Sequence, residues 1–262
     1  MKIGTLLALS AILLAGAARA ADPACSAYTG PHTTALVELY TSEGCDTCPP
    51  ADQWLSSLFS RGFRPDQVVP LSLHVDYWDY IGWKDPYAKG EFSVRQRKLA
   101  AMRRPVIVYT PQVLLQGQDF RRWSGDDFAE QVARINSHAA RARIALAIRA
   151  VEPRAIRAEL SAMLFDSAER KSAAVYLAAY ENRLASEVKA GENRGRRLEH
   201  DFVVREWIGP IAFGESLKLE ESRALPLLPG ADPKNLGVAA FVQNRSTSEV
   251  LQALMLPACP GS

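Results

Sequence analysis

The spacing of apolar residues changes from one half of the chain to the other. Up to about residue 140, apolar runs that suit buried strands alternate with stretches in which apolar residues recur every three or four positions, the period of an amphipathic helix. Strands are predicted over residues 34–41, 67–75, 112–116 and 119–123, and helices over 51–59, 91–102 and 126–138. Beyond residue 141 the apolar residues alternate, which predicts strands over 144–151, 155–163, 173–180, 201–207, 238–244 and 249–256.

The two periods predict two domains. Residues 34–142 contain strands and helices in the order strand, helix, strand, helix, strand, strand, helix, and are expected to form an α/β domain. Residues 143–262 are expected to form an all-β, sandwich-like domain, because their short strands are separated by turn residues. Without the N-terminal apolar run, roughly 240 residues remain, more than the roughly 100 to 200 of a usual single domain, so two cores are expected.

The N-terminus has the pattern of a signal peptide. The apolar run 3–18 closes on Ala-Arg-Ala, the small-x-small sequence at which such peptides are cleaved. A transmembrane anchor needs roughly 20 apolar residues, and Arg19 ends the run too early. The residue after the predicted cleavage is alanine rather than the cysteine of a lipoprotein. Residues 1–20 are therefore predicted to be removed and residues 21–33 to form an N-terminal segment of a periplasmic or secreted protein with no membrane anchor.

The charge of the chain points to no polyanionic partner. The formal net charge is +2, and the loss of Lys2 and Arg19 with the signal peptide brings it to zero. A balanced surface favours neither nucleic acid nor anionic lipid. No glycine-rich phosphate loop, paired-carboxylate pattern or Ser-His-Asp arrangement stands out in the sequence.

The four cysteines fall into two pairs. Cys45 and Cys48 are close together, whereas Cys25 and Cys259 lie near opposite ends of the chain. In an oxidising compartment the distant pair is predicted to form a structural disulfide. The alternative is two free thiols, or thiols that pair with another chain.

Cys45 and Cys48 lie between the first predicted strand and the first predicted helix. A helix N-terminus offers unpaired N–H groups and a partial positive charge, which favour the thiolate of the first cysteine. The two-residue spacing keeps the second sulfur within reach, so Cys45 is predicted to attack a partner and Cys48 to resolve the mixed disulfide. This chemistry requires the Cys45 sulfur to be ionised and reachable.

The dipeptide Thr110–Pro111 precedes the third predicted strand. An X-Pro bond in that position is a candidate cis peptide, and proline removes a strand N–H, which lets a partner backbone approach. Together with the cysteine pair, Thr110 and Pro111 are predicted to position the backbone of a substrate.

Five stretches carry a resemblance to known proteins. They are ELYTSEGCDTCPPAD (38–52), HVDYWDYIGW (74–83), YTPQ (109–112), GEN (191–193) and HDFVVR (200–205). Residues 34–142 resemble a thioredoxin-like domain, and the whole exported chain resembles a family of exported bacterial proteins, domain of unknown function 1223. The resemblance implies a thioredoxin-like fold with a cysteine pair in the redox position. The cysteine pair between strand and helix, with Thr110–Pro111 before the third strand, predicts a thiol–disulfide oxidoreductase-like protein that exchanges disulfides with the thiols of envelope proteins and uses no cofactor.

The chain departs from thioredoxins between the two cysteines. Asp46 and Thr47 stand where thioredoxins carry Gly and Pro. An ionised Asp46 opposes a thiolate at Cys45 and partly offsets the helix dipole. The sequence therefore leaves open whether the pair oxidises or reduces its partner.

Two alternatives to disulfide exchange remain for the cysteine pair. The first is a structural disulfide without turnover, in a non-catalytic scaffold of thioredoxin fold. The second is a copper site of two thiolates and one imidazole. A zinc site is not predicted, because there is no second Cys-x-x-Cys pair to complete it.

Other candidates surround the pair in the predicted sheet. His74 ends the second strand, where an imidazole stabilises a thiolate, binds a metal or is simply hydrogen-bonded in the core. Trp78 and Trp83 lie in an aromatic loop that either forms a groove for a substrate peptide or packs over the sheet edge. His200 and Arg205 are expected at the surface or between strands, and residues 191–195 are expected to form a turn.

Overall fold

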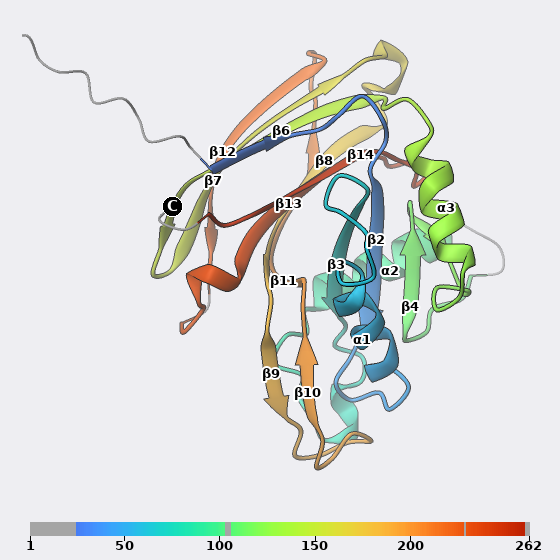
Figure 1. Ribbon diagram of the computed structural model, residues 1–262, viewed down its shortest axis with the longest axis vertical. Coiled ribbons are helices and arrows are strands. Elements are labelled where there is room, and N and C mark those ends of the chain that lie inside the picture. Colours follow the sequence, from blue (N-terminus) through green and yellow to red (C-terminus); the bar gives the residue numbers. More distant parts are fainter. Residues whose placement is uncertain (1–24, 103–105, 228, 260–262) are drawn as a thin grey trace, which may run out of the picture.

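The computed structural model describes residues 25–102, 106–227 and 229–259. The predicted signal peptide, residues 1–20, lies outside them. Within the described residues the chain forms three sheets and three α-helices (Figure 1). No helix in this part of the chain is long and apolar enough to cross a membrane.

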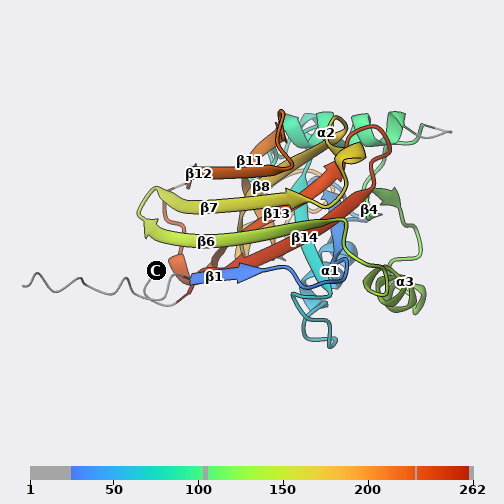
Figure 2. The ribbon, with the colours of Figure 1, turned by 90° about the horizontal axis from the view of Figure 1, so that it is seen from above.

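The first half alternates strands and helices, as the apolar periods predict. Its elements are β1 (Cys25–Tyr28), β2 (Ala35–Thr41), α1 (Pro49–Ser57), β3 (Val68–His74), the 3-10 helix η1 (Asp79–Ile81), α2 (Gly90–Ala101), β4 (Gln112–Leu115), β5 (Gln118–Asp119) and α3 (Asp127–Asn136). Every residue of β2 and β3 is buried. The reason is that α2 covers one face of these strands while α1 and α3 lie on the other side (Figure 2).

The second half is built almost entirely of strands. Its elements are β6 (Ala142–Glu152), β7 (Ala155–Leu164), η2 (Ser167–Glu169), β8 (Ala173–Glu181), β9 (Leu184–Glu187), β10 (Arg197–His200), β11 (Val203–Ala212), β12 (Lys218–Pro226), η3 (Pro233–Asn235), β13 (Leu236–Asn244) and β14 (Val250–Pro257). All six strands predicted there are present. The short strands β1, β9 and β10 and the charged strand β12 are additions to the prediction.

One long sheet joins the two halves of the chain. Its strand order is β14-β13-β8-β11-β3-β2-β4-β5. The strands β2 and β3 run parallel, and β4 and β5 follow β2 in antiparallel order. On the other side of β3, β11 pairs in parallel at Val203 and Ser72, and β8, β13 and β14 continue from it in antiparallel order.

The four-stranded sheet β1-β6-β7-β12 packs on the far end of this long sheet (Figure 2). Inward residues such as Ile144 and Leu160 meet alternate residues of β8 and β13, such as Val175 and Ala240. Two sheets thus pack face to face here, and one of these two layers is the end of the sheet that begins with β2. The expected boundary between residues 142 and 143 does not separate two sheets, because backbone hydrogen bonds between β3 and β11 cross it.

A buried ion pair also links the two halves. Arg95 of α2 donates through Nε to Glu38 Oε1 at 2.6 Å and through a terminal nitrogen to Glu38 Oε2 at 3.0 Å. The same guanidinium donates to Gln243 of β13 at 3.0 Å. It also stacks on three rings of the second half, Tyr176, Trp207 and Phe241, at 4.8–5.2 Å from their centroids. One side chain of the first half is thus fixed by residues from β2, β8, β11 and β13.

The disulfide between Cys25 and Cys259 is present, as the sequence predicts, with the two Cα atoms 5.7 Å apart. It joins β1 to the segment after β14 and closes a loop with a sequence separation of 234. A loop of this length lowers the entropy of the unfolded chain considerably, by about 5 kcal/mol on the chain-entropy estimate.

Removal of this disulfide is expected to destabilise the whole molecule. A Cys25→Ala/Cys259→Ala variant is predicted to lose about 2–5 kcal/mol of unfolding free energy, measured by urea denaturation. The Cys45→Ala/Cys48→Ala variant is the comparison. The disulfide that it lacks joins residues with a sequence separation of only 3, so this bond constrains the unfolded chain little. Equal stability of the wild type and the Cys25→Ala/Cys259→Ala variant would contradict the role of this disulfide.

Candidate functional site

The cysteine pair lies where β2 ends and α1 begins. Cys45 and Cys48 form a disulfide with their Cα atoms 5.5 Å apart. The chain turns tightly here, since Cys45 N donates to Ser42 O at 3.2 Å and Cys48 N donates to Cys45 O at 3.3 Å. Thr41, the last residue of β2, donates through its hydroxyl to Asp52 Oδ2 at 3.0 Å, which fixes α1 to the strand.

The disulfide is buried. Cys45 is 1% exposed and Cys48 is 0% exposed, although Asp46 and Thr47 between them are exposed. The sequence-based expectation that the Cys45 sulfur is reachable by a partner is wrong for this conformation. Any reaction of the pair with another protein requires a neighbouring segment to move.

The turn between β9 and β10 is hydrogen-bonded to the loop that carries Cys45. Asn193, which is fully buried, donates through Nδ2 to Glu43 O and to Cys45 O, both at 2.8 Å. Glu192 accepts a hydrogen bond from Asp46 N at 3.0 Å. Residues 191–195 form a turn as expected, and this turn is fixed to the backbone on both sides of Cys45.

The start of α1 offers fewer N–H donors to the sulfurs than the sequence suggested. Cys48 is the N-cap, and the next two residues, Pro49 and Pro50, have no N–H. The N–H of Ala51 already donates to Cys48 O at 2.9 Å. The helix dipole remains, and the Thr47 hydroxyl lies 3.3 Å from Cys45 Sγ, where it can donate a hydrogen bond to the sulfur.

The aromatic segment connects the cysteine loop to Thr110 and Pro111. The Thr110–Pro111 peptide bond is cis, as the sequence suggested. Trp78 Nε1 donates to Thr110 Oγ1 at 2.7 Å. A Cβ added to Gly44 would lie 3.1 Å from Trp78 Cβ, so this tryptophan packs directly on the residue before Cys45. Trp78 therefore places the cis peptide beside the cysteine loop.

Trp83 also contacts the loop before Cys45. Its Nε1 donates to Glu43 Oε2 at 2.7 Å. Both predicted tryptophans are partly buried and hydrogen-bonded to the site. Through these contacts, the two tryptophans of the aromatic loop pack against the cysteine loop and its neighbour Thr110.

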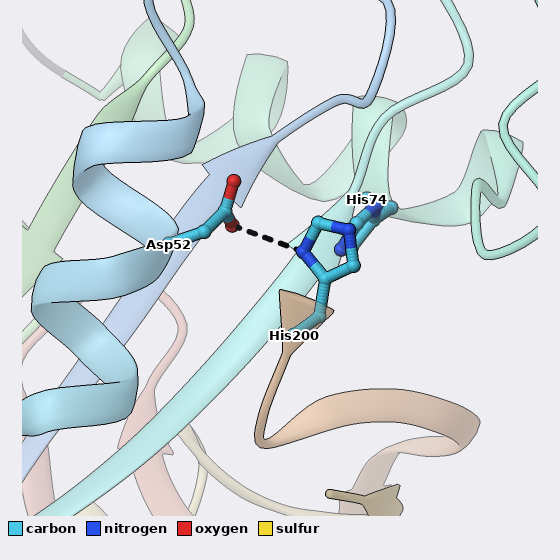
Figure 3. A group of neighbouring side chains, drawn as sticks. All are labelled: Asp52, His74 and His200. Atoms are coloured by element: carbon cyan, nitrogen blue, oxygen red, sulfur yellow. Dashed lines mark ion pairs between the residues drawn. The ribbon is translucent and has the colours of Figure 1, made fainter. Parts of the chain in front are cut away.

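A cluster of buried ionisable groups lies beside α1. His74 is fully buried and its Nδ1 lies 2.7 Å from Asp85 Oδ2. His200 is 2% exposed, with Nε2 3.1 Å from Glu43 Oε1 and Nδ1 3.8 Å from Asp52 Oδ1. The two imidazole rings are 4.9 Å apart, nearly perpendicular. Asp52, His74 and His200 come from α1, β3 and β10 (Figure 3).

The carboxylates set the charge of this cluster. Burial lowers the pKa of His200, but the nearby Asp52 carboxylate, together with the hydrogen bond and charge of Glu43, outweighs it and raises the pKa to about 10. Burial raises the pKa of Asp85, but the charge and hydrogen bond of His74 and two backbone N–H groups lower it below its ordinary value. Without a bound cation, the cluster thus holds ionised groups away from water.

Comparison with protein-family models assigns the chain to a family. The family model described as "Protein of unknown function (DUF1223)" matches residues 36–243. The chain belongs to this family. Among curated proteins, none matches it.

Two solved structures share the fold of this DUF1223 protein. A crystal structure of a protein from Agrobacterium tumefaciens is 24% identical with a TM-score of 0.64, and the match covers 89% of this chain and 98% of that one. The protein HBP35 of Porphyromonas gingivalis is 14% identical with a TM-score of 0.67, and the match covers 87% of this chain and 76% of that one. At these identities the similarity concerns the fold alone.

Residues 36–243, which the DUF1223 family model matches, contain every residue of the site, including two that the sequence analysis did not connect with it. His200 was expected at the surface or between strands, but it is buried against α1. Asn193 was seen only as part of a turn. The signal for His200 is the alternation in β10, where Leu198 and His200 are buried and their neighbours are exposed. Arg205 lies 3.4 Å from Glu181 on the adjacent strand β8, an inter-strand position.

Proposed function

We propose that this DUF1223 protein is an exported, thioredoxin-like protein that exchanges disulfides with the thiols of other envelope proteins through Cys45 and Cys48. The observation that carries the proposal is the disulfide between these residues at the junction of β2 and α1. The strand order β3-β2-β4-β5, with only β2 and β3 parallel, is the arrangement expected of a thioredoxin-like domain and supports it. The contacts of Trp78 with Thr110 and Gly44 support a role of Thr110 and Pro111 in positioning a substrate backbone beside the loop.

The exchange needs no reagent beyond the two proteins. A substrate thiolate attacks Cys45 Sγ, the Cys45–Cys48 bond breaks, and Cys48 leaves as a thiolate that takes up a proton. A second substrate thiolate then attacks the substrate sulfur of the mixed disulfide and releases Cys45. The substrate leaves oxidised by two electrons and the pair is reduced by two. In the reverse direction, Cys45 attacks a substrate disulfide and Cys48 resolves the mixed disulfide.

Access to Cys45 requires the turn at 191–195 to open. An Asn193→Ala variant loses the two buried hydrogen bonds to Glu43 O and Cys45 O, which lowers the free energy of opening by about 1–3 kcal/mol. Reduction of the Cys45–Cys48 disulfide by a small thiol is therefore expected to be roughly 5- to 150-fold faster in this variant. The measurement is the rate of alkylation of the released thiols.

The chain offers a matched control for this experiment. Asn136 also donates through Nδ2 to two backbone carbonyls, Thr33 O and Gln67 O, away from the cysteine loop. The Asn136→Ala variant loses bonds of the same kind and is expected to keep the wild-type reduction rate. If both variants react at the wild-type rate, the turn does not control access.

The proposed function is tested by catalysis of exchange. The wild-type protein is expected to accelerate the reduction of a disulfide-bonded peptide by glutathione, and the Cys45→Ala/Cys48→Ala variant is expected to lose this acceleration. A Cys25→Ala/Cys259→Ala variant that remains folded keeps the activity, because its dithiol is intact. A wild-type rate no higher than that of the Cys45→Ala/Cys48→Ala variant would contradict the proposal.

A further inference from the structure

Beside the disulfide, three side chains from distant parts of the sequence converge in the protein interior. Asp52, His74 and His200 are all buried, and each offers one ligand atom within 4.8 Å of the other two (Figure 3). We propose that these three residues bind a divalent transition-metal ion, a site that goes beyond the proposed disulfide exchange and uses neither cysteine.

Each of the two histidines has a carboxylate beside one ring nitrogen, as metal-binding histidines usually do. A histidine that binds a metal through one ring nitrogen usually donates its other N–H to a carboxylate, which fixes the ring and its tautomer. Here Asp85 holds Nδ1 of His74 at 2.7 Å, and Glu43 faces Nε2 of His200 at 3.1 Å. Two separate carboxylates therefore orient the two imidazoles.

The remaining ring nitrogens are left without a partner. Within the described residues, neither His74 Nε2 nor His200 Nδ1 has a hydrogen-bond partner, although both are buried. The contact of His200 Nδ1 with Asp52 Oδ1 is 3.8 Å long, beyond hydrogen-bond distance. Asp52 is itself oriented through its other oxygen by the Thr41 hydroxyl. Buried polar atoms without partners are rare, and an ion between the two histidines satisfies both nitrogens.

The charge of the cluster also favours a cation. Glu43, Asp52 and Asp85 are buried carboxylates, and among the described residues their ion pairs are formed with the two imidazoles alone. In the metal-bound state both imidazoles are neutral ligands, and the three carboxylates then carry three negative charges in the interior. A divalent ion bound by His74, His200 and Asp52 offsets two of them.

The ligand types and distances indicate the class of metal. Two imidazoles and one carboxylate suit zinc and the neighbouring first-row ions rather than calcium or magnesium. With bonds of about 2.0–2.2 Å, tetrahedral ligand atoms lie about 3.5 Å apart. The 3.8 Å between His200 Nδ1 and Asp52 Oδ1 is close to this value.

Zinc binding to the oxidised protein tests the proposal. The chain, with both disulfides intact, is stripped with chelator in urea and refolded with Zn²⁺, because the site is buried. We expect one zinc per chain and a higher Tm than that of the metal-free protein. Co²⁺ in place of zinc is expected to give the visible absorption of a tetrahedral site. A wild-type protein that refolds and retains no zinc would overturn the proposal.

Variants distinguish this site from other modes of binding. His74→Gln and His200→Gln are each expected to weaken zinc binding by more than about 100-fold, and Asp85→Asn, which removes the charge that orients His74, by about 10–100-fold. His138→Gln is the matched control, because His138 is an exposed histidine away from the cluster and its loss leaves binding unchanged. Circular dichroism checks that each variant folds. If the histidine variants do not fold, the zinc affinity of Asp85→Asn tests the proposal in their place.

The proposal of a metal site and the proposal of disulfide exchange can be tested independently of each other. The Cys45→Ala/Cys48→Ala variant is expected to bind zinc like the wild type, whereas it loses disulfide exchange. Loss of zinc in that variant, or binding that His138→Gln abolishes and His200→Gln does not, would assign the ion to other ligands and overturn the proposal.

Discussion

A Cys48→Ser variant is expected to retain a substrate covalently bound to Cys45, whereas a Cys45→Ser variant is expected to retain none. In the wild type the Cys48 sulfur resolves the mixed disulfide within the same molecule, and intramolecular attack by a well-placed group is far faster than attack by a thiol from solution. Without Cys48, the lifetime of the adduct is expected to increase at least about a hundredfold. Non-reducing electrophoresis and mass spectrometry of the trapped species measure it.

The pair of single variants assigns the order of attack. The Thr47 hydroxyl is 3.3 Å from Cys45 Sγ, while Cys48 is the fully buried N-cap of α1. These contacts favour Cys45 as the sulfur that bonds to the substrate. Equal trapping by both variants would contradict this order, and trapping by Cys45→Ser alone would reverse it.

An Arg95→Met variant is expected to lose about 3–5 kcal/mol of unfolding free energy. The substitution leaves the Glu38 carboxylate buried without its bidentate partner and leaves Gln243 Oε1 without a donor. It also removes the cation from between Tyr176, Trp207 and Phe241. Urea denaturation gives the change, and one cooperative transition is expected, because the pair joins both halves of the chain.

Arg97 provides the control on the same helix. It is exposed and stacks on Tyr77 at 5.6 Å, so Arg97→Met is expected to change the stability by less than about 0.5 kcal/mol. A Glu38→Leu/Arg95→Met double variant is expected to recover part of the loss, because it removes the unpaired charge. If Arg95→Met costs no more than Arg97→Met, the buried pair does not hold the halves together.

The sequence predicts most elements because their apolar patterns follow from burial. β2 and β3 are covered on both faces and appear as continuous apolar runs, whereas β6 and β7 alternate because only one face is covered. The alternation of apolar residues along a strand, however, indicates which face is buried and does not indicate which strand lies beside it. The pairing of β3 with β11, which merges the two expected domains into one sheet, therefore left no trace in the pattern.

The candidate site was predictable only in part, for a similar reason. Cys45, Cys48 and the cis Thr110–Pro111 bond belong to local motifs whose geometry follows from the neighbouring residues. Asn193 and His200 reach the cysteine loop from about 150 positions away. A single tertiary contact of this kind leaves no period in the sequence, and the burial of Cys45 that results from it was not predicted.

Reduction of the two disulfides in the same folded chain tests the proposed function most directly. The native protein is exposed to a thiol without denaturant, and released cysteines are identified by alkylation and mass spectrometry over time. We expect Cys45–Cys48 to open at least about tenfold faster than Cys25–Cys259, and to re-form when the thiol is removed while the chain stays folded. Opening of Cys45–Cys48 only at the rate of global unfolding would contradict the account and leave it a structural disulfide.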